Sequence, residues 1–184
     1  MTTRLPDAET FPVRRLNIRV PSVRGFQQQY EAAVPPAPLD KIGELVQRQA
    51  PWSDMIALVQ ASAPHGFLVY FKEDLHRLLS LAGNPGDSRD SVMYLMGNHV
   101  TAERMYRHDA RTLLYAPLRT LIWEDSDGDA WFSLEQPSLL FGSLGARDVT
   151  EVGMELDREL AALLRFLGLD VPRPLHDGVA AGKG

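Results

Sequence analysis

The sequence contains no cysteine among its 184 residues, and that absence excludes several classes of site. Disulfide frameworks, thiolate nucleophiles, Cys-ligated zinc and Cys-held iron–sulfur clusters all require the missing sulfur. The sequence also lacks any run of ~18 apolar residues, which a membrane helix needs. Near its start, Asp7 and Glu9 stand where a secretory signal would have its apolar core. We therefore expect a cytoplasmic protein with no membrane partner.

A strong charge imbalance and the common phosphate-binding motifs are missing as well. The net charge is only −5, so nothing favours nucleic acid as a partner. Neither G-x-G-x-x-G nor G-x-x-x-x-G-K-S/T occurs, and 142–145 is one residue too short for a G-x-S-x-G elbow. The acidic loop 125–129 fails as a calcium loop, because its sixth and twelfth positions are Ala130 and Gln136. No metal is predicted, and the cofactor stays unknown.

The residue patterns that are present predict an α+β domain. Leu16, Ile18 and Val20 alternate with polar residues, as in a half-buried strand. A long helical stripe of Val and Leu spans 149–167, with Gly168 and Pro172 as stop signals. Irregular alternation of strands and helices favours a mostly antiparallel sheet with helices on one face. Further strands are expected at 66–71, 91–96, 118–124 and 130–135, and further helices at 22–33, 39–49, 52–63 and 98–108.

The domain organisation follows from where these periodic patterns begin and end. We expect a single domain over 13–169. Residues 1–12 show no periodicity and are predicted to form a flexible arm. Residues 170–184, which end in Ala-Ala-Gly-Lys-Gly, are predicted to form a disordered tail.

Titratable side chains concentrate in the segment 97–109. Asn98 is a good N-cap, which puts His99 at the first position of the helix. The positive end of the helix dipole disfavours an imidazolium there, so we expect a neutral His99 facing a cavity. Glu103 lies one turn further on, and His108 with Asp109 could form an oriented imidazole. The competing interpretation is a solvated helix face with no role in chemistry.

Aromatic residues in the predicted strands supply a second group of candidates. Trp123 and Trp131 are expected to lie near each other across a hairpin. Such residues line a ligand pocket in some proteins and form the core or a subunit interface in others. The candidate catalytic residues are therefore His99, His108, Asp109 and Glu124, and the candidate ligand-binding residues are Asn98, His99, Glu103, Tyr70 and Trp123.

Four segments give the chain a resemblance to a known family. They are 94–98 (YLMGN), 105–109 (MYRHD), 114–119 (LYAPLR) and 123–128 (WEDSDG), and 153–160 is similar to the family's C-terminal helix. In this order they resemble the domain-of-unknown-function 302 family. The resemblance implies a TATA-box-binding-protein-like (TBP-like) strand–helix–four-strand–helix arrangement in a compact, often dimeric protein. It brings no catalytic residue set, and it departs at His99, where the family commonly has proline.

Three hypotheses of function remain open from the sequence. The first is a homodimeric binder of a small apolar molecule, with itself and that ligand as partners. The second is an enzyme that uses His99 or His108 as an acid–base group or as a haem or metal ligand. The third is a structural dimerisation module without a ligand. Fold alone does not decide among them.

Overall fold

One five-stranded sheet organises the fold, and every neighbouring pair of its strands is antiparallel. We use a computed structural model that describes residues 8–74, 76, 79, 81 and 89–177. The strand order is β1-β5-β4-β3-β2, with β4 at the centre. The strands are β1 (Arg15–Val20), β2 (Leu68–Glu73), β3 (Ser91–Gly97), β4 (Leu118–Glu124) and β5 (Ala130–Glu135).

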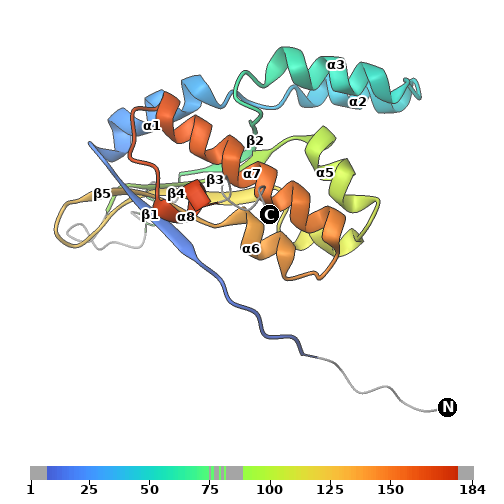
Figure 1. Cartoon of the computed structure of the whole chain (residues 1–184). Helices are drawn as coiled ribbons and strands as arrows, with labels where there is room; N and C mark the ends of the chain where they lie inside the picture. Colours follow the sequence, from blue (N-terminus) through green and yellow to red (C-terminus); the bar gives the residue numbers. More distant parts are fainter. Residues whose placement is uncertain (1–7, 75, 77–78, 80, 82–88, 178–184) are drawn as a thin grey trace.

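Helices cover one face of this sheet, and α1 and the long α7 lie across it (Figure 1). This confirms the predicted α+β class, the antiparallel sheet, the one-sided helical layer and the long C-terminal helix. The TBP-like assignment stays a prediction. The helices are α1 (Val23–Ala33), α2 (Leu39–Gln47), α3 (Trp52–Ser62), α5 (His99–Tyr106), the 3-10 helix η2 (Ala110–Leu114), α6 (Pro137–Gly142), α7 (Arg147–Phe166) and α8 (Arg173–Asp177).

Local sequence signals account for the first two elements. In β1 the alternate residues Leu16, Ile18 and Val20 are buried while their neighbours are exposed, as the period of two requires. Ser22 then caps α1, because its hydroxyl accepts a hydrogen bond from the Gly25 N–H at 3.2 Å. The apolar stripe of α1 is buried over its whole length. Strand and helix therefore fold as their hydrophobic periods predict.

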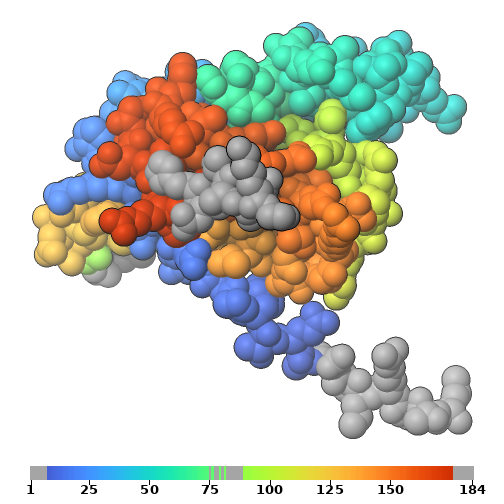
Figure 2. Space-filling view, viewed as in Figure 1, coloured from blue at the N-terminus to red at the C-terminus, as the bar shows by residue number. Residues whose placement is uncertain are grey.

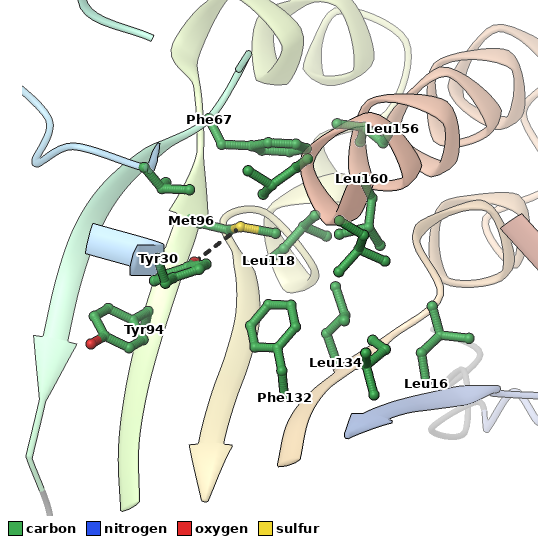
Figure 3. Close-up of a cluster of buried hydrophobic side chains, with 14 of the residues drawn as sticks. Leu16, Tyr30, Phe67, Tyr94, Met96, Leu118, Phe132, Leu134, Leu156 and Leu160 are labelled. Carbon is green, nitrogen blue, oxygen red and sulfur yellow. Dashed lines mark hydrogen bonds between the residues drawn. The ribbon is translucent and has the colours of Figure 1, made fainter. Parts of the chain in front are cut away.

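The core lies between the sheet and the helical layer (Figure 3). Tyr30 of α1 is fully buried, and its ring lies 4.9 Å from that of Tyr94 and 5.4 Å from that of Phe132. Its hydroxyl is also satisfied, by the Met96 sulfur at 3.2 Å and the Thr120 hydroxyl at 3.3 Å. A buried tyrosine needs such partners because an unpaired hydroxyl in an apolar core is costly.

The helices α2 and α3 form a projection at one end of the molecule (Figures 1 and 2). Ile42, Met55 and Val59 form a small buried cluster of their own within it. Val100 of α5 packs against this cluster, so the projection is attached to the element that follows β3. None of the described helices is both long and apolar enough to cross a membrane.

Two short elements were not predicted from the sequence, although each begins with a recognisable signal. Asp109 caps the start of η2, because its carboxylate accepts a hydrogen bond from the Arg111 N–H at 2.8 Å. α6 has Pro137 at its first turn, where a proline costs no hydrogen bond. Both elements are too short for hydrophobic periodicity to reveal them, since one turn and a half samples too few positions.

The structure differs from the sequence analysis at the predicted tail. Residues 173–177 form helix α8, and Leu175 is buried in the main core with 1% of its surface exposed. A single apolar residue has no period, which is why the pattern did not reveal it. In the predicted arm, the Phe11 ring contacts the Tyr115 ring edge-on at 6.0 Å. Within these two segments, residues 1–7 and 178–184 lie outside the described part of the chain.

Candidate functional site

A cavity of about 140 Å³ lies between α5, the end of β3, the start of β4, and the helices α6 and α7. Its lining is mostly apolar and includes several buried core residues. Leu113, 59% exposed, also lines it. Among the described residues that line the cavity, none is Lys, Arg, Asp or Glu. The buried lining residues are Met96, Met105, Leu118, Phe141 and Leu156.

Tyr70 reaches this cavity because β2 is irregular. The pairing of β2 with β3 shifts between Val69 and Phe71, so Tyr70 is an extra residue in the strand. Such a bulge redirects a side chain that regular alternation would place elsewhere. The proline-rich connector holds the bulge, since Val69 bonds to Pro35 and Ala37 through backbone hydrogen bonds of 2.9 and 2.8 Å.

His99 is held opposite Tyr70 by the cap of α5. The Asn98 side chain accepts from the Thr101 N–H at 2.7 Å, which fixes the start of the helix. His99 is therefore the first residue of α5, and its Nδ1 lies 2.8 Å from the Tyr70 hydroxyl oxygen. The two rings meet edge to face, 5.0 Å apart. The pair, with Asn98 and Thr101, forms the polar part of a mostly apolar lining.

Burial keeps both members of this pair neutral. It raises the pKa of Tyr70 to about 12, because the phenolate would lose its hydration. It lowers the pKa of His99, because the imidazolium would lose its hydration. The sequence argument reached the same direction for His99 from the helix dipole, whereas desolvation is the cause that the structure gives. A neutral phenol–imidazole pair can bind a polar group or transfer a proton.

A second interaction of Asn98 ties the start of α5 to the loop before β2. Its Nδ2 donates to the Gly66 carbonyl at 2.6 Å. Gly66 has a positive φ of 79°, and a Cβ there would lie 3.2 Å from Glu159 Oε2, so glycine suits the position. Burial raises the pKa of Glu159, and its Oε2 has no hydrogen-bond partner. Above that raised pKa the buried charge weakens folding, so this contribution favours the folded state only at lower pH.

The other predicted residues of segment 97–109 lie outside the cavity lining. Glu103 forms an ion pair with Arg107 one turn along α5. His108 Nδ1 lies 3.7 Å from an Asp148 carboxylate oxygen rather than beside Asp109. Asp109 pairs with Arg111 at 2.7 Å, and the hydrogen bonds from that guanidinium lower the pKa of Asp109. Glu124 ends β4, two strands away from β2, and does not line the cavity either.

Trp123 lies on the opposite face of the sheet from the cavity. It pairs with Trp131 directly across the hairpin, as the sequence predicts. Its indole N–H donates to the Ser133 hydroxyl at 2.9 Å, and the Trp131 N–H donates to Asp125 at 2.8 Å. The structure therefore brings together Tyr70, Asn98 and His99 and separates Trp123 from them. No group of three or more His, Cys, Asp or Glu suited to a metal ion occurs among the described residues.

Sequence reasoning missed the residues that give the cavity its shape. Met105 and Leu156 belong to predicted helices, but their apolar spacing indicates only burial. Phe141 lies on α6, which was not predicted, although Pro137 after Gln136 was an available signal. No local pattern indicates that these side chains, which are distant in sequence, meet around one space.

The fold and the site define a class of protein: a one-domain α+β protein with a small apolar cavity under a single helical layer. Residues 47–167 match the model of the family described as domain of unknown function DUF302, and the chain belongs to that family. It is also similar to the crystal structure of an uncharacterized conserved DUF302 protein from Bacillus stearothermophilus. That likeness has a TM-score of 0.56 at 14% identity, and covers 83% of this chain and 95% of the other. No curated protein matches.

Proposed function

We propose that this protein binds a small, mostly apolar molecule in the cavity beside α5. The observation that supports this proposal is a mostly apolar cavity lining that contains the Tyr70–His99 pair, whose two side chains are positioned by the protein itself. Ligand sites are typically concave and apolar, with a few polar groups that set the orientation. The bulge in β2 and the Asn98 cap hold the two polar groups in place without a ligand.

The size of the cavity limits what it can bind. Its volume of about 140 Å³ is close to the ~150 Å³ of an engineered apolar cavity that takes up benzene. A single ring or a short branched chain fits such a space, whereas a haem or a nucleotide does not. Leu113, which also lines the cavity, is more than half exposed to solvent.

Filling the cavity should abolish binding. We expect benzene to produce NMR shifts in the methyl groups of Met105 and Leu118, and Ala102→Leu to remove them because the larger side chain occupies the space. Ala57→Leu is the matched control, since Ala57 is exposed on α3. Unchanged shifts in Ala102→Leu, or no shifts in the parent protein, would contradict the proposal.

We also propose that the protein forms a homodimer through the uncovered face of its sheet. This outer face carries Phe71, Met93, Leu95, Leu121, Trp123 and Trp131, which share a face through the strand register. Phe71 is 46% exposed and the others are half-buried. A contiguous apolar area of this kind supports an interface with a second copy.

Charges on the outer face support self-association rather than a different partner. Arg119 lies opposite Leu95, and Glu73 lies opposite Met93. Within the described part of the chain, neither the Arg119 side chain nor the Glu73 side chain forms a hydrogen bond or an ion pair. A two-fold contact through the apolar centre would allow Arg119 of each copy to face the partner's Glu73.

A charge exchange tests this interface. We expect the parent protein to sediment with the mass of a dimer. Either Arg119→Glu or Glu73→Arg should raise the dissociation constant of the dimer roughly tenfold or more. When both substitutions are present in one chain, the dissociation constant should return toward that of the parent protein. Like charges facing each other across the interface cause the loss, and the double variant restores the attraction. Glu44→Arg, an exposed change on α2, is the control. A monomer at all concentrations, or no recovery in the double variant, would overturn the dimer proposal.

A further inference from the structure

We infer that the molecule this cavity accepts is neutral and carries one hydroxyl group, which bonds to the Tyr70–His99 pair while a compact hydrocarbon body fills the apolar part. This inference rests on the proposed function, because it specifies the chemical class of the same ligand. It follows from three features: the hydrogen-bonding capacity of the pair, the engagement of the neighbouring polar groups and the absence of a cation.

Whichever residue donates the Tyr70–His99 hydrogen bond, the pair keeps one hydrogen-bond donor and one acceptor free for a ligand. If the Tyr70 hydroxyl donates to Nδ1, the imidazole keeps an N–H at Nε2 and the phenol oxygen keeps acceptor capacity. If Nδ1–H donates to the phenol oxygen, the Tyr70 hydroxyl keeps its proton and Nε2 accepts. One donor and one acceptor therefore remain. A hydroxyl group, which both donates and accepts, matches that remainder.

The other polar group of the α5 start is already engaged. The Asn98 amide accepts from the Thr101 N–H at 2.7 Å and donates to the Gly66 carbonyl at 2.6 Å. Breaking either bond would weaken the helix start or the loop before β2. Thr101 also lines the cavity and, among the described lining residues, is the remaining polar competitor for a ligand hydroxyl.

An anionic ligand is disfavoured by the lining. None of the described lining residues is Lys or Arg. Burial lowers the pKa of His99, so its imidazole supplies no positive charge at neutral pH, and the Tyr70 phenol carries no positive charge at any pH. A carboxylate would lose its hydration without gaining a counter-charge, which costs far more than burying a hydroxyl.

NMR titrations at pH 7.5 with three ring compounds of similar size, benzene, phenol and benzoate, test the preference for a neutral hydroxyl group. We expect phenol to bind about two- to tenfold tighter than benzene, as one net hydrogen bond provides, and benzoate to bind at least about tenfold weaker than phenol. In the double variant Tyr70→Phe, His99→Leu the phenol preference should disappear while benzene still binds. Each single variant should retain part of it, since one polar partner remains.

Thr101→Val is the matched control, because it removes a different lining hydroxyl. It should leave the ratio of phenol to benzene affinity unchanged. Equal affinities for phenol and benzene in the parent protein, tight binding of benzoate, or loss of the preference in Thr101→Val would overturn this inference and leave the proposed function intact. If neither benzene nor phenol binds, the proposed function itself fails.

Discussion

Replacing Asp157 by alanine is expected to lower the free energy of unfolding by about 3–4 kcal/mol. Asp157 lies on α7 and is 2% exposed. Its carboxylate accepts from the Gln136 side chain at 2.6 Å, from the Ser138 backbone N–H at 2.9 Å and from the Ser138 hydroxyl at 2.6 Å. Alanine removes the acceptor of three hydrogen bonds, and among the described residues the Gln136 side-chain N–H group keeps only its bond to the Ser138 hydroxyl at 3.0 Å. Each buried group left unsatisfied costs about 1–3 kcal/mol. Urea unfolding measures the loss.

This carboxylate fixes the start of α6 on α7. Gln136 also accepts from Arg14 through its Oε1 at 2.9 Å, so the residues before β1 are attached to the same network. Glu151→Ala is the control, since Glu151 is half-exposed on the same helix and, among the described residues, its side chain pairs only with Arg147. We expect that control to cost ~0.5 kcal/mol or less. Equal effects of the two substitutions would show that α6 does not depend on Asp157.

Gly153→Val is expected to destabilise the protein by about 2–3 kcal/mol and to reduce ligand binding. At Gly153, α7 approaches α6 closely, because a Cβ there would lie 3.1 Å from the Ser138 Cα and 3.2 Å from the Phe141 Cβ. The Ser138 atom belongs to the backbone, so α6 itself has to move. Since Phe141 lines the cavity, the displacement should change the volume available to benzene.

A second helical glycine provides the matched control. Gly43 lies on α2, and a Cβ built there meets no atom within 4 Å. Gly43→Ala should therefore raise stability by about 0.5–1 kcal/mol, because alanine loses less backbone entropy in a helix. Thermal unfolding of Gly153→Val and Gly43→Ala measures both changes in stability, which should have opposite signs. A neutral Gly153→Val would mean that the contact between α6 and α7 is loose.

The candidate site was predicted from the sequence in part. Asn98 and His99 follow from local signals, because a cap and a first helical position are properties of neighbouring residues. Tyr70 was a candidate as a strand aromatic, but alternation gives no sign of the bulge that turns it toward His99. The apolar lining was not predictable, since Met105, Phe141 and Leu156 come from three separate helices.

The sequence by itself determined the longer helices, the strands and the class of the fold, but not η2, α6 or α8. Strand β1 and the long helix α7 have strong hydrophobic periods, and periodicity depends only on the order of residues. Only the tertiary structure decided which side chains share the cavity, which aromatic residues stay on the uncovered face, and that Leu175 joins the core. These depend on packing between segments far apart in the chain, which local pattern does not encode.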